Sequence, residues 1–567
     1  MKKELSMEVR LLIAFVLMGL VLLVSQYFIK PTPVATPAPG SATSAQPVVP
    51  AVPGKPTVQP EAIIPSNVKR TAVELAVNEV KASSEELVTI DTDLYRVVFS
   101  NRGAVVRSWV LKGKYKDSAG KPLDLVYQPA LSRVPAPFSV VFKGQAPATD
   151  PNTALFQTSR GGEGLDVSFE FSDGRALTKK TFHFEKDKYL IAVTSEVTQN
   201  GAAVPHLLTW RGGFGDPAVR NPASVQHALY YDLPNSKLQS KSAGDAKNGP
   251  ISAGGQFSFV GIEDTYFTAA FLPGDKPNVE QTTFADPVPD ADGKDEKRVG
   301  VGVGGEGLNA LSLFVGPKDT DLLRQVNPKL EQVVDWGWFG VIAKPLFIAL
   351  NWTTDHVVHN YGWSIVLVTL VINILLFPLK ISSMKSSKKM QVLQPQIKAI
   401  NEKYKGLSMK DPKKSEQNQE VMDLYKKNGV NPVGGCLPML LQMPFLYAFY
   451  KVLGVSIEMR GAHWLWVSDL SQPEALAIHL LPLLLVATQF LMQRMTPSPG
   501  VDPAQQKMMM FMPLMFGYMF YFASAGLVLY WLTGNVVGIV QQWLLNKTLP
   551  AAPEPPPKPA SNKKGRN

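Results

Sequence analysis

The chain has 567 residues, of which 45% are hydrophobic and 18% are charged, and its formal net charge is +10. This length leaves room for more than one domain. The positive charge does not indicate a nucleic-acid-binding face, because the lysines cluster beside apolar segments, as they do near a membrane surface. The single cysteine, Cys436, excludes an intramolecular disulfide, a cysteine-based zinc site and a CxxC redox pair.

The N-terminus carries an apolar segment, Leu11–Ile29, directly after a basic stretch. A helix of this length spans about 30 Å, the thickness of the hydrocarbon layer. The segment ends in Tyr, Phe and Ile instead of small residues, so we expect residues 1–30 to form an uncleaved anchor; a cleaved signal peptide is the alternative. Residues 31–70 are rich in Pro, Ala and Ser and predict an extended linker.

Residues 71–330 form short segments in which apolar and polar side chains alternate. A period of two predicts half-buried strands, and turn sequences such as SDGR and DADGKD separate them. We therefore expect an antiparallel β-sandwich in this part of the chain. The clearest predicted strands are Leu94–Ser100, Ala104–Leu111, Leu165–Ser172 and Tyr189–Val197.

One glycine-rich motif, GVGGEG at Gly302–Gly307, fits the dinucleotide-binding pattern GxGxxG. That pattern needs a helix after it, whereas LNALSLFVG follows with the periodicity of a strand. The motif therefore predicts a turn.

The chain becomes helical and apolar in residues 331–549. Its first segment mixes Trp and Phe with charged residues, which is typical of an amphipathic helix at the membrane interface. His356 and His359 are three residues apart there, but no carboxylate or thiol accompanies them in the sequence, so we expect no metal site.

Four apolar regions follow, and the last is too long for one helix and breaks at Ala523–Gly526. Together with the N-terminal anchor they predict six transmembrane helices. The lysine-rich stretch between the first two, residues 381–430, has helical periodicity and predicts a helical hairpin. The regions are Trp363–Leu379, Pro432–Leu453, Leu476–Met492 and Met508–Leu545.

The charges of the loops predict the topology. Lysines dominate residues 381–430 and both termini, including the tail at 550–567, whereas the loop Val455–Pro473 sets Arg460 against Glu458 and Asp469. The positive-inside rule therefore places both termini and the hairpin in the cytoplasm and the β-domain outside. We expect a multi-pass protein of a bacterial inner membrane.

Several motifs resemble the YidC-type membrane protein insertases of Gram-negative bacteria, which are related to the mitochondrial Oxa and thylakoid Alb families. Their order and spacing match over Asp335–Leu549, and the β-domain matches more weakly through YRVVFSNRGA, KTFHFEKDKYL and DTYF. The resembling motifs are YGWSIVLVTLVI, FPLK, MQVLQPQIKAI, LYKKNGVNPVGGCLPMLLQMPFLYAFY, DPAQQKMMMFMP and GLVLYWLTGNVVGIVQQWL.

The resemblance implies a five-helix insertase core behind the anchor, with a supersandwich-like periplasmic β-sandwich. A hydrophilic groove, open to the cytoplasm and to lipid, would take nascent membrane proteins without nucleotide, metal or enzymatic chemistry. The expected partners are nascent membrane proteins, the Sec translocon with its accessory subunits, the lipid bilayer, and the ribosome through the basic tail and the hairpin.

Asn373 lies in the middle of an apolar span, where an amide without a hydrogen-bond partner is costly. Thr369, Asn373 and Lys380 fall within roughly 60° of one helical stripe, so we expect them to line the groove. By resemblance the position of Asn373 usually holds an arginine, so this sequence departs from the family pattern. A helix-packing amide is the alternative for Asn373.

The resemblance carries further residues over by position. Gln442, Tyr530 and Trp531 are expected in the groove, with helix packing or an interfacial location as the alternative. The methionines of the DPAQQKMMMFMP region would give an adaptable apolar surface for client segments, although lipid-facing packing explains them nearly as well. The methionines of this region and of the residues directly after it are Met508, Met509, Met510, Met512, Met515 and Met519.

Two other functions are compatible with parts of the sequence. A transporter or channel would show ionisable residues in mid-membrane or inverted repeats, and neither is evident in the spans. An anchored periplasmic carbohydrate-binding protein would suit a mutarotase-like sandwich, but no convincing carboxylate pair stands out in it and one anchor would be enough.

Overall fold

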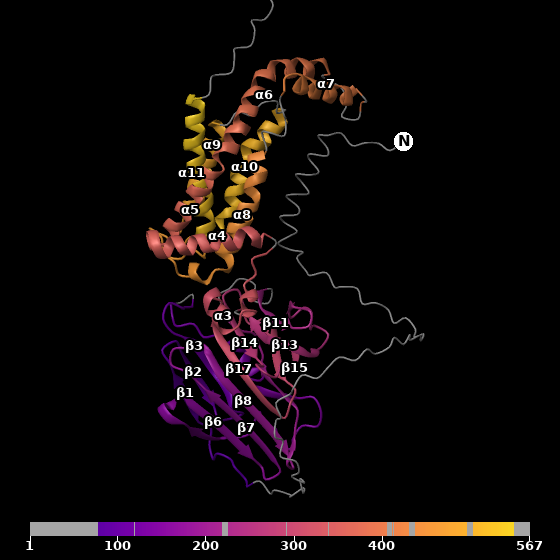
Figure 1. Ribbon diagram of the computed structural model, residues 1–567, viewed down its shortest axis with the longest axis vertical. Coiled ribbons are helices and arrows are strands. Elements are labelled where there is room, and N and C mark those ends of the chain that lie inside the picture. The colour runs from indigo at the N-terminus through magenta and orange to yellow at the C-terminus, as the bar shows by residue number, and fades with distance from the viewer. Residues whose placement is uncertain are drawn as a thin grey trace, which may run out of the picture. The chain divides into compact units, whose positions relative to one another are not determined.

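The computed structural model describes residues 78–117, 120–217, 225–290, 292–337, 339–404, 411, 413–429, 437–495 and 503–548. The predicted N-terminal anchor, the linker and the basic tail lie outside these residues. Strands occupy the first part of the described chain and helices the second (Figure 1).

The first part is built from antiparallel strands, and the four strands predicted from alternation are present as β2, β3, β6 and β8. The strands are β1 Leu87–Asp91, β2 Tyr95–Ser100, β3 Val105–Leu111, β4 Ser139–Phe142, β5 Gln157–Arg160, β6 Asp166–Ser172, β7 Ala176–His183, β8 Leu190–Gln199, β9 Ala202–Ala203, β10 His206–Trp210, β11 His227–Asp232, β12 Lys237–Lys241, β13 Ile251–Glu263, β14 Phe267–Leu272, β15 Asn278–Pro289, β16 Asp295–Gly304 and β17 Leu308–Pro317.

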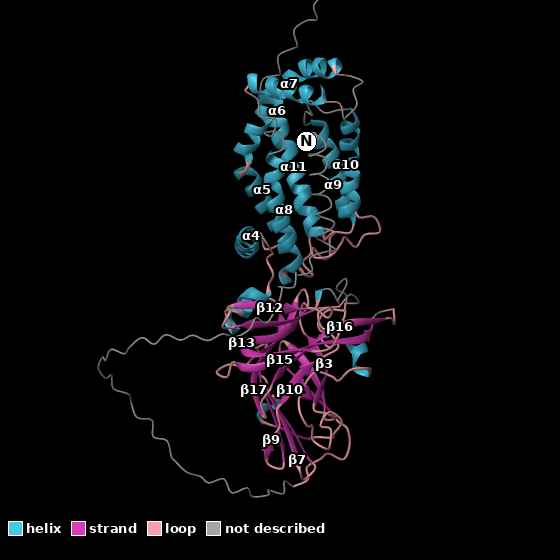
Figure 2. Cartoon of the chain, turned by 90° about the vertical axis from the view of Figure 1, so that its right-hand side faces the viewer, coloured by secondary structure: helices cyan, strands magenta, loops and turns pink. Residues whose placement is uncertain are grey.

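The strands form a small sheet, β1-β2-β3, and a long one in the order β4-β10-β16-β15-β13-β14-β17-β8-β7-β6-β5. Strand β13 bends between the two halves of the long sheet: Ile251–Gln256 pairs with β15, and Val260–Glu263 pairs with β14. The GVGGEG motif spans the end of β16 and the turn into β17, as predicted. The β-sandwich expected from the sequence is confirmed (Figure 2).

The core of the sandwich is apolar and aromatic, with Trp109, Phe138 and Phe182 fully buried in it. The side chain of Lys180 also points into this core, because residues 176, 178, 180 and 182 alternate inward along β7. Its Nζ donates hydrogen bonds to the carbonyls of Gly103 (2.7 Å), Ala104 (3.3 Å) and Phe138 (2.8 Å). Burial lowers the pKa of Lys180 from 10.5 to about 7.

The lowered pKa of Lys180 predicts a pH-dependent stability. Between pH 7 and 10.5 the unfolded chain binds a proton that the folded sandwich lacks, so the free energy of unfolding rises with pH. The slope is at most about 1.4 kcal/mol per pH unit, and Lys180→Met should abolish it. Hydrogen exchange of β7, corrected for intrinsic rates at several pH values, measures the slope.

Lys179→Met is the matched control, since Lys179 lies on the same strand with an exposed side chain beside Glu170. It should keep the wild-type slope. An undiminished slope in Lys180→Met would contradict the assignment.

The second part of the chain is helical, and the predicted break after the methionine-rich segment lies between Tyr521 and Ala525. The helices are α3 Thr320–Val326, α4 Gly340–Thr353, α5 Tyr361–Leu375, α6 Phe377–Lys403, α7 Lys413–Lys427, α8 Leu437–Val455, α9 Leu480–Met495, α10 Pro503–Tyr521 and α11 Ala525–Thr548. A π-helical turn, Thr354–Val358, follows α4.

Helix α11 packs against α5, α8 and α9, and the residues buried among these helices are mostly Leu, Val and Phe (Figure 2). The apolar region Trp363–Leu379 is two helices and not one, since α5 ends at Leu375 and α6 begins at Phe377. Pro378 explains the break, because proline lacks the N–H group that would continue the helical hydrogen bonds across this point.

Among the described residues, no single helix is both long and apolar enough to cross a bilayer. Gly340–Val358 and Tyr361–Leu375 meet that test only as a pair, bent by 114°. The count of six transmembrane helices therefore stays a prediction.

A smaller compact unit of the chain includes Pro395–Val430. Within it the end of α6 and α7 are joined by side-chain hydrogen bonds from Lys403 to Glu420 (2.6 Å) and from Gln417 to Asn401 (2.6 Å). These contacts join the described parts of α6 and α7, and the helical hairpin over residues 381–430 stays a prediction.

Candidate functional site

Polar side chains of α5 lie within an otherwise apolar helix. Asn360 caps the helix by accepting hydrogen bonds from the N–H groups of Gly362 (3.0 Å) and Trp363 (3.2 Å). Further along, Thr369 is fully buried and its hydroxyl donates to the carbonyl of Ile365 at 2.6 Å. The amide of Asn373, half-buried, donates to the carbonyl of Thr369 at 2.9 Å. Both side chains are thus satisfied within their own helix.

Gln541 of α11 connects Asn373 to Lys380. Its Nε2 donates to the backbone carbonyl of Asn373 (3.1 Å), and its Oε1 accepts from Lys380 Nζ (3.0 Å). Gly538, one turn earlier on α11, makes room for the lysine, because a Cβ atom there would lie 3.2 Å from Lys380 Nζ and 2.8 Å from Met492 Cε. The predicted stripe of Thr369, Asn373 and Lys380 therefore does not lie on one continuous helix, because α5 ends before Leu376. Gln541 links its two parts by bonding to both Asn373 and Lys380.

Two other predicted residues, Gln442 and Tyr530, lie together. Tyr530 is buried and stacks on Phe449 of α8, with ring centroids 3.9 Å apart. Gln442 is exposed on α8 and hydrogen-bonds to the side chain of Tyr530. Trp531 packs instead on Phe516 and Phe520 of α10, so its ring is directed to a different neighbour.

The methionine-rich helix α10 presents an apolar face. Met510, Met515 and Met519 are more than half exposed, and Met512 is half-buried. Phe511, Leu514, Tyr518 and Phe522 extend the same exposed face. Met508 is part of α10, but its side chain lies outside the described residues.

Sequence reasoning missed several polar residues of α9 and α11. Asn535 donates to the hydroxyl of Thr488 (3.2 Å), and Gln542 donates to the carbonyl of Met495 (3.3 Å). Gln489 has a buried side-chain oxygen for which the described residues offer no hydrogen-bond donor. The available signal was the seven-residue spacing of Asn535 and Gln542, which places two amides on one face of an apolar helix.

Comparisons with known proteins define the class of this protein. Residues 87–349 match the family model of the YidC periplasmic domain, and residues 352–552 match that of the 60Kd inner membrane protein. The chain is therefore an inner-membrane protein with a periplasmic β-domain, and the two matches meet within α4.

The relatives narrow the class to one family. The chain is 35% identical over 483 residues to the membrane protein insertase YidC of Geobacter sp. (strain M21), covering 82% of this chain and 86% of the relative. For the insertase YidC of Citrifermentans bemidjiense the identity is 34% over 559 residues, covering 96% and 100%. The chain belongs to the YidC family of membrane protein insertases, which confirms the resemblance seen in its motifs.

A solved structure is also similar. It is described as an active YidC insertase crystal structure with the first transmembrane domain resolved. The similarity covers 82% of this chain and 94% of that chain, with 20% identity and a TM-score of 0.35.

The bridge through Gln541 generates a prediction. Gln541→Leu removes the acceptor of Lys380 and the donor to Asn373, and hydrogen bonds between membrane helices contribute about 0.6–2 kcal/mol. The variant should lose stability in that range, measured by thermal unfolding in nanodiscs. Gln541→Glu keeps an acceptor for Lys380 but loses the donor to Asn373, so it should lose less stability than Gln541→Leu; equal losses in both variants would contradict the bridge.

Proposed function

We propose that this protein is a membrane protein insertase that takes nascent transmembrane segments through a hydrophilic groove into the inner membrane, alone or with the Sec translocon. The family supports the activity. The observation that carries the groove is the pairing of Lys380, Gln541 and Asn373 within a bundle of apolar helices. Such polar groups shorten the hydrocarbon path that the polar tail of a client must cross.

The groove residues of this proposal are Thr369, Asn373, Lys380, Gln442 and Tyr530, with Trp531 beside them on α11. The contact of Asn373 supports a groove over helix packing, because its amide bonds to Thr369 of its own helix and not to a neighbouring helix. Lys380 supplies the positive charge, and its ammonium is held by a neutral amide.

The apolar side of the route is the exposed face of α10. Unbranched methionine side chains adapt to client segments of different shape. Met512, Met515 and Met519 would contact the apolar part of a client while its polar tail lies in the groove. The protein would do this without covalent chemistry, with both termini and the hairpin in the cytoplasm and the ribosome bound there by basic residues.

Asn373→Leu tests the groove. It removes a polar group without breaking a bond between helices, so stability should be maintained while insertion of clients with polar tails falls several-fold. Clients without a translocated tail provide the control and should insert at the wild-type rate. Asn373→Arg should accumulate and function, because a wet cavity accommodates the charge. Failure of this variant to accumulate in the membrane would refute the groove.

Lys380 gives a charge-specific prediction. Lys380→Gln should slow insertion of clients with acidic tails more than insertion of clients with neutral tails, because the attraction to the carboxylates is lost. Lys380→Arg should preserve the difference between the two clients. Matched clients that differ only in tail charge, inserted into proteoliposomes, measure it. Equal slowing of both clients by Lys380→Gln would show that its charge is not used.

A further inference from the structure

The loop that follows α8 is buried against two hydrophobic clusters at once. Ile457 belongs to the cluster of the β-sandwich, which contains Tyr115 and Phe267, and is 1% exposed. Met459, two residues later, is fully buried in the cluster of the helical core. The side chains of this short segment therefore alternate between the sandwich and the helices.

Arg460 follows directly and enters a site built by the sandwich. Its guanidinium forms an ion pair with Asp216, and its Nη2 donates to the backbone carbonyl of Lys116 at 2.7 Å. The same group lies over the rings of Tyr266 (5.4 Å) and Phe267 (5.5 Å). The side chains of Arg460 and Asp216 are only 11% and 4% exposed. A carboxylate, a carbonyl and aromatic faces are the partners that a planar guanidinium favours.

Asp264, in the turn between β13 and β14, organises this site. Its carboxylate accepts hydrogen bonds from the N–H groups of Asp216 (2.6 Å), Tyr266 (2.7 Å) and Phe267 (2.7 Å). Gly215 has a φ of +91°, and a Cβ atom there would lie 2.1 Å from the Asp264 carboxylate. The segment that presents Asp216 is therefore fixed from within the sandwich.

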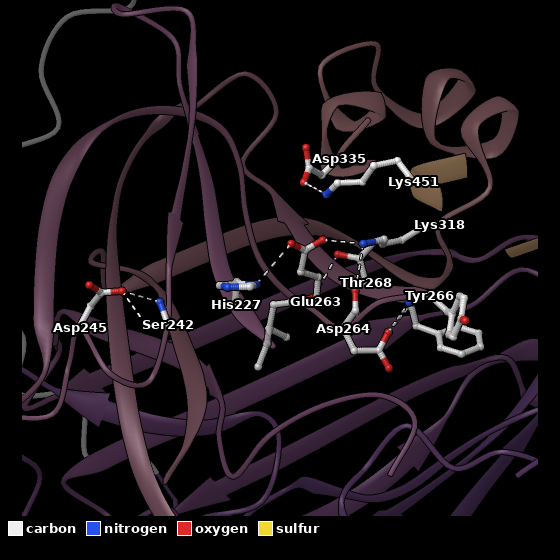
Figure 3. A network of polar contacts seen from close by, with 12 residues as sticks. His227, Ser242, Asp245, Glu263, Asp264, Tyr266, Thr268, Lys318, Asp335 and Lys451 are labelled. Atoms are coloured by element: carbon white, nitrogen blue, oxygen red, sulfur yellow. Dashed lines mark hydrogen bonds and ion pairs between the residues drawn. The ribbon is translucent and has the colours of Figure 1, made fainter. Parts of the chain in front are cut away.

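Two lysines make further contacts near this site, Lys318 at the end of the sandwich and Lys451 on α8 (Figure 3). Lys318 donates to the carbonyl of Asp264 and to the carboxylate of Glu263, each at 2.9 Å. Lys451, near the end of α8, pairs with Asp335 at 2.9 Å. Burial raises the pKa of Asp264 to about 6, and the N–H groups of Asp216, Phe267 and Tyr266 oppose that rise.

We propose that the β-sandwich carries a guanidinium-binding site, filled by Arg460, through which it docks onto the loop between α8 and α9 and holds the adjoining ends of both helices. Such a site is separate from the insertase activity, because it lies on the β-domain and binds a guanidinium group. The contacts of Asp264 that position Asp216, Tyr266 and Phe267 lie within the sandwich, so we expect the site to form before docking.

The chemistry of the ion pair between Arg460 and Asp216 explains why docking of the β-sandwich would depend on Arg460. Loss of Arg460 leaves the buried carboxylate of Asp216 without its guanidinium partner, and a broken buried ion pair is strongly destabilising. Lysine is an incomplete substitute, since it provides the charge without the planar fork that reaches both Asp216 and the carbonyl of Lys116.

Arg460→Ala in the full chain in nanodiscs tests the site by hydrogen exchange. Exchange of residues 456–471 should rise on the order of tenfold when the loop is released, while exchange of β7 remains unchanged and reports an intact sandwich. Millimolar methylguanidinium should restore protection of the loop, and methylammonium at the same concentration should not. Arg460→Lys should give an intermediate rate and covers the case in which the alanine variant does not accumulate.

Arg133→Ala is the matched control, because Arg133 forms an exposed ion pair with Asp295 on the same sandwich. It should leave the exchange of residues 456–471 unaltered. Unchanged exchange in Arg460→Ala, or equal restoration by methylammonium and methylguanidinium, would overturn the proposal.

Discussion

A polar side chain placed among apolar helices must find its hydrogen-bond partner inside the protein, because hydrocarbon supplies none. This chain meets the requirement in two ways. Thr369 and Asn373 bond to carbonyls of their own helix, which leaves their polar surface independent of neighbouring helices. The side-chain amide of Gln541 instead forms hydrogen bonds with two other helices, to Asn373 of α5 and to Lys380 of α6. The first arrangement leaves part of the half-buried Asn373 side chain exposed, although Thr369 is fully buried, and the second fixes where a charged side chain lies.

The β-sandwich faces the same requirement with cations. Lys180 is surrounded by backbone carbonyls, which accept hydrogen bonds but carry no full negative charge, so burial lowers its pKa. Arg460 is instead buried against a carboxylate, with which it forms an ion pair. We therefore expect the buried lysine to make the stability of the sandwich depend on pH, whereas the arginine has a carboxylate that compensates its charge.

The sequence predicted what depends on local periodicity. Alternation located the strands, the missing helix after GVGGEG identified a turn, and the small residues after Tyr521 located the break between α10 and α11. The break at Leu376 could have been predicted from Pro378. Gln541 could not be assigned its role, because its partners lie 161 and 168 residues away and only the packing of α11 on α5 brings them together.

The ion-pair partner of Arg460 could not be predicted from the sequence either. In the sequence its apparent partners are Glu458 and Asp469 of its own loop, whereas the structure pairs it with Asp216, 244 residues earlier. This pairing bears on topology by an argument independent of lysine counts. An ion pair between a loop of the helical core and the sandwich requires both to lie on the same side of the bilayer. The topology predicted from the lysines places the β-domain outside, so this contact predicts that the loop between α8 and α9 lies outside as well.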